Sequence, residues 1–101
     1  MEFIFGDLAN DFTLDETNVL LALTQFTEPL LVERIGELAE VAIELAEKAL
    51  RSLANRSLVI PDLEERAFTL MTMFGDFLRR KWPETITETR SRLVRKAYIK
   101  P

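Results

Sequence analysis

The sequence predicts an all-α protein, an antiparallel bundle of about four helices with a short N-terminal arm. Apolar residues recur at spacings of three and four over most of the chain, which is the period of an amphipathic helix. Capping signals and prolines divide this pattern into four segments, at about residues 13–26, 28–54, 61–82 and 84–98. We expect residues 1–101 to form a single helical-bundle domain, with residues 1–12 as the arm.

The arm and the first helix are predicted from local signals. The arm is rich in large apolar residues, so we expect it to cover an open end of the bundle or to cross to a second subunit: Phe3, Ile4, Phe5, Leu8 and Phe12. Thr13 and Glu16 have the spacing of a capping box, in which each side chain binds the backbone N–H of the other residue. This motif predicts that the first helix starts at residue 13.

The segment 28–54 has the strongest apolar pattern in the chain. Its apolar residues follow heptad spacing, and further apolar positions widen the stripe beyond the area that one partner helix can cover. We therefore predict a central helix that also forms the seam of a homodimer. The predicted interface residues are Leu31, Ile35, Leu38, Ala42 and Leu45.

The last two helices are predicted from the same spacing and from proline positions. In the segment 61–82, apolar residues are again separated by four, three, four and three positions: Leu63, Ala67, Leu70, Phe74 and Phe77. Pro61 is compatible with a helix start, and Pro83 ends this helix because the residue before proline avoids the helical conformation. The segment 84–98 has Ile86, Leu93 and Val94 on its apolar face.

Composition excludes several classes of chemistry. The chain has no cysteine and no histidine. Disulfides, thiolate zinc sites, thiol catalysis and histidine-based catalysis are therefore excluded, and any metal would need oxygen ligands. The longest apolar run, 19–23, is far too short to span a membrane, and Glu2 and Asp7 occupy the region where a signal peptide needs positive charge. We expect a cytoplasmic protein.

The charge of the chain is divided between its two parts. The net charge is −4, with −10 in residues 1–78 and +6 in residues 79–101. The candidate basic patch is Arg92, Arg95 and Lys96. One interpretation is that these residues pair with acidic neighbours and complement the dipole of the last helix. The alternative is that they bind an anionic partner such as nucleic acid.

Glutamates at i, i+4 and i+7 lie along one face of the segment 28–54. These residues are Glu33, Glu37 and Glu40, and the stretch 33–40 resembles the first metal motif of the all-α nucleotide pyrophosphohydrolases, the MazG-like family. The resemblance implies magnesium ions held by acidic residues on two facing helices, with Glu65 as the contribution of the second helix. The sequence departs from the family because Arg34 replaces the second of two adjacent glutamates and the Glu-x-x-Asp motif is missing.

We therefore predict a non-catalytic helical interaction or assembly module that forms a homodimer and needs no cofactor. The partner would be a second copy of the chain or another protein, and we expect neither a membrane nor nucleic acid as the partner. Two alternatives remain open. One is a magnesium-dependent pyrophosphohydrolase of nucleoside triphosphates that uses Glu33, Glu37, Glu40 and Glu65. The other is a nucleic-acid-binding protein that uses the basic C-terminal helix.

Overall fold

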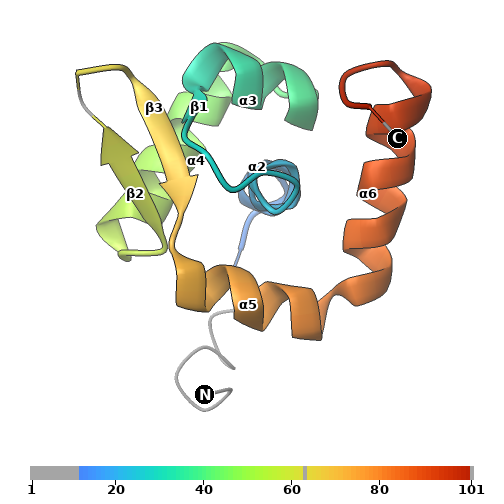
Figure 1. The fold of residues 1–101 in the computed structure, drawn as a ribbon. Helices are drawn as coiled ribbons and strands as arrows, with labels where there is room; N and C mark the ends of the chain where they lie inside the picture. Colours follow the sequence, from blue (N-terminus) through green and yellow to red (C-terminus); the bar gives the residue numbers. More distant parts are fainter. Residues whose placement is uncertain (1–11, 63, 101) are drawn as a thin grey trace.

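The computed structural model describes residues 12–62 and 64–100 (Figure 1). The elements follow one another as α2 (Leu14–Leu23), β1 (Leu30–Leu31), α3 (Val32–Ala39), α4 (Ile43–Asn55), β2 (Val59–Asp62), β3 (Ala67–Leu70), α5 (Thr72–Lys81) and α6 (Pro83–Arg95). The chain is mostly helical, as predicted. The prediction of an all-α bundle is wrong, because three strands form a small antiparallel sheet in the order β1-β3-β2.

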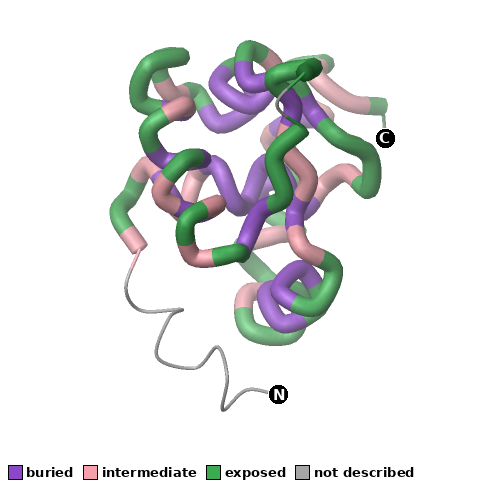
Figure 2. The backbone as a smooth tube through the Cα atoms, turned by 90° about the vertical axis from the view of Figure 1, so that its left-hand side faces the viewer, coloured by how far each residue is buried: buried purple, intermediate pink, exposed green. Residues whose placement is uncertain are grey.

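Helix α2 lies at the centre of the fold and is surrounded by α3, α5 and α6 (Figure 1). Its start confirms the predicted capping box. The backbone N–H of Thr13 donates to the Glu16 carboxylate at 2.8 Å, and the backbone N–H of Glu16 donates to the Thr13 hydroxyl at 3.1 Å. Val19, Leu20 and Leu23 of α2 are buried in the core. Figure 2 shows buried segments of several elements gathered in the interior.

The prediction of one long helix over 28–54 is wrong, because the chain turns sharply at residues 40–42. Glu40 ends α3 in the left-handed conformation, with φ 58° and ψ 44°, and α4 begins at Ile43. Gly36 permits this turn. A Cβ atom at Gly36 would lie 3.1 Å from the Val41 carbonyl oxygen and 3.6 Å from the Ala46 Cβ. The glycine is therefore explained by the close approach of α3 and α4.

The turn separates the predicted interface residues. Ile35 and Leu38 have no exposed surface and belong to the core, so they are not available to a second subunit in this structure. Leu31 and Leu45 are 49% and 47% exposed, and Ala42 is exposed. The apolar seam is therefore not one continuous surface, and most of the surplus apolar area is covered within the chain.

The predicted helix 61–82 is wrong in its first half, which forms the hairpin of β2 and β3. Val59 pairs with Leu70 and Asp62 pairs with Ala67, while β1 adds to β3 through the pair of Leu30 and Phe68. Val59, Ile60 and Thr69 are β-branched and favour strands. Pro61 is tolerated because β2 is an edge strand, where one row of backbone groups needs no partner strand.

The two C-terminal helices agree better with prediction. Helix α5 covers the second half of the segment 61–82, and α6 covers most of the segment 84–98.

Phe12, the last residue of the predicted arm, packs against Phe74 and Trp82, with ring centroids 6.0 and 6.4 Å apart. The rest of the predicted arm lies outside the described residues. Within residues 12–62 and 64–100, no helix is long and apolar enough to cross a membrane.

The capping carboxylate of Glu16 gives the fold a pH dependence. Burial by itself would raise its pKa, but hydrogen bonds from Thr13 and Ser52 and the charge of Arg56 outweigh burial, so the pKa is lowered from 4.5. Such a carboxyl stabilises the fold above its ordinary pKa, and this stabilisation is lost as pH falls through the lowered value. We expect Glu16→Gln to weaken the loss of stability below pH 4.5, as measured by urea unfolding at a series of pH values.

The matched control is Glu28→Gln, since Glu28 is exposed and makes no ion pair within the described residues. The control should keep the acid dependence of the native chain. An unchanged acid dependence in Glu16→Gln would contradict the role of the buried carboxylate.

Candidate nucleic-acid interface

Helices α3 and α4 form a helix-turn-helix, and the β2–β3 hairpin follows directly. Two helices joined by a turn of three residues are the basis of many DNA-binding proteins, in which the second helix enters the major groove. With strand β1 before α3 and the hairpin after α4, the arrangement is that of a winged helix-turn-helix. We call the hairpin over residues 59–70 the wing.

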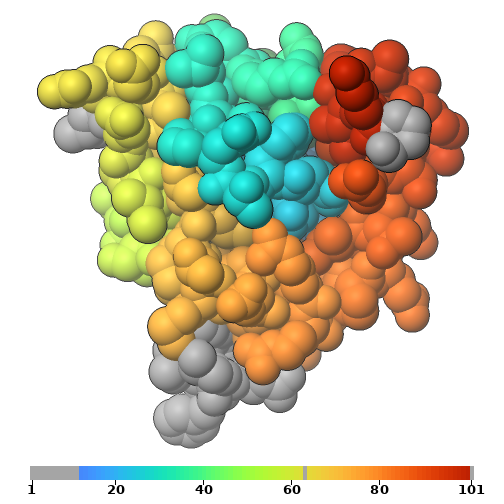
Figure 3. Space-filling model, in the orientation of Figure 1, coloured from blue at the N-terminus to red at the C-terminus, as the bar shows by residue number. Residues whose placement is uncertain are grey.

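Helix α6 holds the turn of the helix-turn-helix in place. The Arg92 guanidinium donates to the Glu40 carboxylate at 3.2 Å and to the Leu38 carbonyl at 3.3 Å, and the Lys96 ammonium donates to Glu40 at 2.6 Å. The hydrogen bond from Lys96, with the charges of both basic residues, lowers the pKa of Glu40. Figure 3 shows the C-terminal end of α6 lying against α3. The turn is therefore fixed by tertiary contacts.

Substitutions at Glu40 test the backbone conformation of this turn. Glu40→Gly and Glu40→Ala both remove the carboxylate and its contacts with α6, so their comparison isolates the left-handed backbone at φ 58°. Glycine adopts this conformation without the steric cost that a Cβ atom brings. We expect Glu40→Gly to be about 1 kcal/mol more stable than Glu40→Ala, as measured by urea unfolding at pH 7. Equal stabilities would show that position 40 carries no backbone strain.

Helix α4 has one face in the core and one face in solvent. Ala46, Ala49, Leu50 and Leu53 are buried. The opposite face carries a polar stripe at spacings of four, three and four, and each of its residues is exposed: Glu44, Lys48, Arg51 and Asn55. We call these four residues the α4 stripe. Because all four side chains are exposed, this face can contact a partner beyond the surface of the protein.

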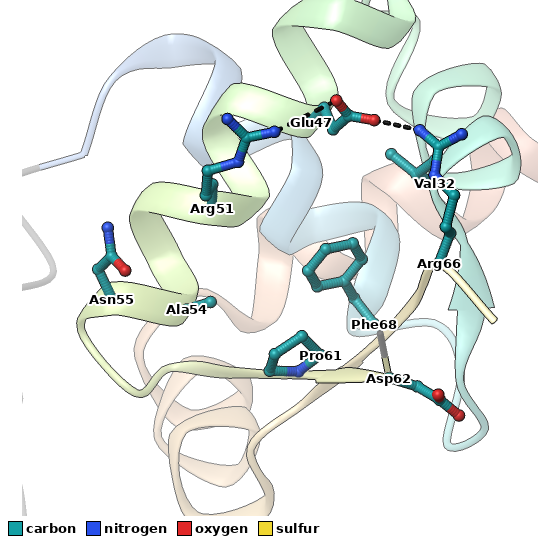
Figure 4. A pocket seen from close by; sticks show the side chains of 9 residues that line it. All are labelled: Val32, Glu47, Arg51, Ala54, Asn55, Pro61, Asp62, Arg66 and Phe68. Carbon is teal, nitrogen blue, oxygen red and sulfur yellow. Dashed lines mark hydrogen bonds and ion pairs between the residues drawn. The ribbon is translucent and has the colours of Figure 1, made fainter. Parts of the chain in front are cut away.

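The wing is attached to both helices of the helix-turn-helix. The Arg66 guanidinium forms an ion pair with Glu47 of α4 and lies 3.9 Å from the Glu33 carboxylate. The backbone N–H of Val32 donates to the Arg66 carbonyl at 3.0 Å. Arg51 also reaches the Glu47 carboxylate, at 3.4 Å, so that Glu47 lies between two arginines (Figure 4). The contacts of Arg66 hold the wing beside α4.

The surface formed by α4 and the wing is not basic. Within the described residues it carries five acidic and three basic side chains, a formal charge of −2: Glu44, Glu47, Asp62, Glu64 and Glu65 against Lys48, Arg51 and Arg66. The excess of positive charge lies on α5 and α6. Phosphate attraction by this surface is therefore weak, and any DNA affinity must come mainly from base contacts.

The glutamates of the metal alternative are engaged elsewhere. Glu37 pairs with Arg34 at 2.6 Å, Glu33 lies near Arg66, and Glu40 is held by α6. These three border one hollow on α3, but Glu65 lies between the strands of the wing. Within the described part of the chain, no three acidic side chains are grouped so that they could hold a metal ion. The facing acidic helices that the resemblance implies are not formed.

The residues of the candidate basic patch have different surroundings. Arg92 and Lys96 both pair with Glu40 within the chain. Arg95 is exposed and forms no ion pair with any described residue. Arg90 and Lys100 are likewise exposed. The basic C-terminal region is thus partly used to hold the turn of the helix-turn-helix.

Sequence reasoning missed the α4 stripe as a candidate site. Four polar residues on a helical face are common, and the predicted helix 28–54 ends before Asn55. Two features of the sequence are compatible with the observed fold. The small residues Gly36 and Ala46 allow α3 and α4 to approach closely, and β-branched residues after residue 58 favour a hairpin. No protein-family model matches this chain, and no curated protein is similar to it in sequence. The arrangement of helices α3 and α4, the wing and the α4 stripe therefore carries the proposal of a function.

Proposed function

We propose that this chain is a non-catalytic binding module that recognises double-stranded DNA through helix α4. The observation that carries the proposal is the α4 stripe, exposed on the second helix of a helix-turn-helix and flanked by a wing. A helix of this kind fits the major groove, which is about 12 Å wide. The predicted class of function, a non-catalytic module acting through a helix surface, is kept, but the proposed partner is DNA and not the protein partner predicted from the sequence.

The side chains of the α4 stripe suit recognition of base edges. Arginine and lysine donate to guanine, and asparagine forms paired hydrogen bonds with adenine. Glutamate accepts from the cytosine amino group. Lys48, Arg51 and Asn55 succeed one another along α4, so they would contact successive positions along the groove. Recognition would depend on the DNA sequence, because a surface with a formal charge of −2 has little sequence-independent attraction for phosphates.

The formal charge of this surface leads to a definite expectation for how DNA affinity depends on salt concentration. The slope of log K against log salt is about −0.9 for each phosphate that a basic group neutralises. With Lys48, Arg51 and Arg66 as the basic groups of the surface, we expect a slope of roughly −3 or shallower for each protein chain. A much steeper slope would indicate that the basic residues of α5 and α6 bind the DNA instead.

The test is selection of binding sites from a pool of random DNA duplexes, followed by fluorescence anisotropy with the enriched sequence. We expect enrichment of a short motif, and binding of a scrambled duplex that is weaker by about 1,000-fold. If no sequence is enriched at low salt, the proposal fails and a protein partner becomes the better explanation of the exposed α4 face.

The predicted homodimer is the second candidate, and it is compatible with the first. The side of the sheet that faces away from α4 carries Leu31 and Ile60, which are 49% and 56% exposed. A twofold dimer would also bring two α4 helices to two half-sites on DNA. Light scattering coupled to gel filtration should give about twice the chain mass of 11.7 kDa. A monomer at tens of micromolar protein would exclude a stable dimer.

A further inference from the structure

A groove of about 460 Å³ lies between helix α4 and the wing (Figure 4). Apolar groups from three parts of the chain line it. Val32 comes from α3, Ala54 comes from α4, and Pro61 and Phe68 come from a cross-strand pair of the wing. The Phe68 ring stands in the middle of this lining in Figure 4. The volume is within the range of pockets that bind small molecules.

The rim of the groove combines two arginines with a single carboxylate that they share. Arg51 and Arg66 both point toward Glu47 (Figure 4). A guanidinium has five N–H donors, and the contact with Glu47 uses one nitrogen of each arginine. Arg66 also lies 3.9 Å from the Glu33 carboxylate, which is beyond hydrogen-bond distance. Donors of both arginines therefore remain for another acceptor.

The other carboxylate of the lining is directed elsewhere. Asp62 accepts a hydrogen bond from the backbone N–H of Glu65 at 3.3 Å, and its side chain points away from both arginines in Figure 4. The amide of Asn55 lies on the α4 side of the groove and adds a further polar group. The groove thus has an apolar body with an excess of hydrogen-bond donors at one end.

We propose that this groove binds a small aromatic carboxylate. The aromatic ring packs on Phe68 and Pro61, where flat apolar surfaces favour stacked or edge contacts. The carboxylate accepts charge-assisted hydrogen bonds from Arg51 and Arg66, whose planar guanidinium groups match its geometry. Glu47 competes with the ligand for the same donors, so the negative charge of Glu47 lowers the affinity.

Binding in this groove has a consequence that rests on the proposed function. Arg51 is part of the α4 stripe, and Arg66 belongs to the wing. A ligand that engages both arginines competes with DNA for the same side chains. The groove would then be the place where a small metabolite of this class releases the protein from DNA.

The test uses the free protein without DNA, so that its result is independent of the proposed function. Uniformly ¹⁵N-labelled protein is titrated with 2-naphthoate and, separately, with the neutral analogue 2-naphthamide. We expect 2-naphthoate to shift the backbone amide signals of Arg51, Asn55 and Phe68, with saturation at about millimolar concentration. The naphthamide should bind at least about fivefold more weakly, because it lacks the charge that the arginines recognise.

Two substitutions are expected to change the Kd for 2-naphthoate in opposite directions. Arg66→Gln should raise the Kd for 2-naphthoate by about fivefold, and Glu47→Gln should lower it by a similar factor, because the competing charge is removed. Arg80→Gln, on α5 and outside the groove, is the matched control and should leave the Kd unchanged. Dispersed amide spectra establish that each variant is folded, and Arg51→Gln replaces Arg66→Gln if the latter is not.

The proposal is overturned by any of three results. These are the absence of shifts at the groove residues, equal affinity for the naphthoate and the naphthamide, or a Glu47→Gln variant that binds 2-naphthoate more weakly than the native chain. If the groove binds 2-naphthoate but no DNA motif is enriched in the selection experiment, the ligand site stands and the proposed DNA function fails.

Discussion

Ile35→Glu is expected to unfold the chain at neutral pH. Ile35 has no exposed surface and belongs to the core. A carboxylate buried there without a partner must either stay charged or take up a proton. Full burial raises carboxyl pKa values by about three to five units, so this substitution costs roughly 4 kcal/mol or more of folding free energy. The loss of isoleucine packing adds to this cost. Domains of this size have stabilities of about 5–15 kcal/mol in total.

The matched control is Leu31→Glu, four residues earlier, where the side chain is 49% exposed. This carboxylate can remain in water, so we expect a change of about 1 kcal/mol or less in the free energy of unfolding. Circular dichroism during heating measures both variants. The melting temperature of Ile35→Glu should fall by about 15–30 °C, if the variant folds at all. Equal effects at both positions would contradict the assignment of Ile35 to the core.

The same pair of variants bears on the predicted dimer. If Leu31 lies in a dimer interface, Leu31→Glu should lower the dimer population while leaving the fold of each chain intact. If the predicted seam contained both Leu31 and Ile35, each of the two substitutions would instead weaken dimerisation and folding together. Light scattering on Leu31→Glu therefore separates an interface on the sheet from a seam through the core.

Replacing Lys48 and Arg51 together by glutamine is expected to weaken sequence-specific DNA binding strongly. Each paired contact between a side chain and a base contributes about 1–3 kcal/mol of discrimination. Loss of both contacts should raise the Kd for the enriched duplex by about 30-fold or more. Both residues are exposed on α4, and the ion pair of Arg51 with Glu47 is largely in solvent, so stability should change little.

Arg90→Gln is the control for this experiment. Arg90 is an exposed residue of α6 and forms no ion pair within the described residues, so its replacement should change the Kd by about twofold or less. Fluorescence anisotropy with the enriched duplex measures both variants. If Arg90→Gln weakens binding as much as the double variant does, the basic C-terminal helix is the DNA-binding element and α4 is not.

Local signals in the sequence determined part of this structure correctly. The capping box at Thr13 and Glu16 is formed by residues three positions apart, and its hydrogen bonds are present. The apolar period over 84–98 predicted α6, since a helix is built from contacts between near neighbours in sequence. The absence of cysteine and histidine excluded whole classes of chemistry without any structure.

The break between α3 and α4 could not be predicted from the same kind of signal. Leu38, Ala42 and Leu45 keep helical spacing across the turn, so apolar periodicity alone is equally compatible with one helix and with two. The left-handed conformation at Glu40 is held by Arg92 and Lys96, which lie 52 and 56 positions away. Contacts over such distances in the chain leave no local pattern.

The wing and the candidate site depended on tertiary structure for the same reason. Leu63, Ala67 and Leu70 have helical spacing, but β3 pairs with β2 in a hairpin and also with Leu30 and Leu31 of β1, far upstream. The sequence by itself determined the helical character of the chain, the capping of α2 and the residues suited to a core. Only tertiary structure decided where the long apolar segment turns back and which polar residues of α4 remain in solvent, because both depend on packing between segments that are distant in sequence.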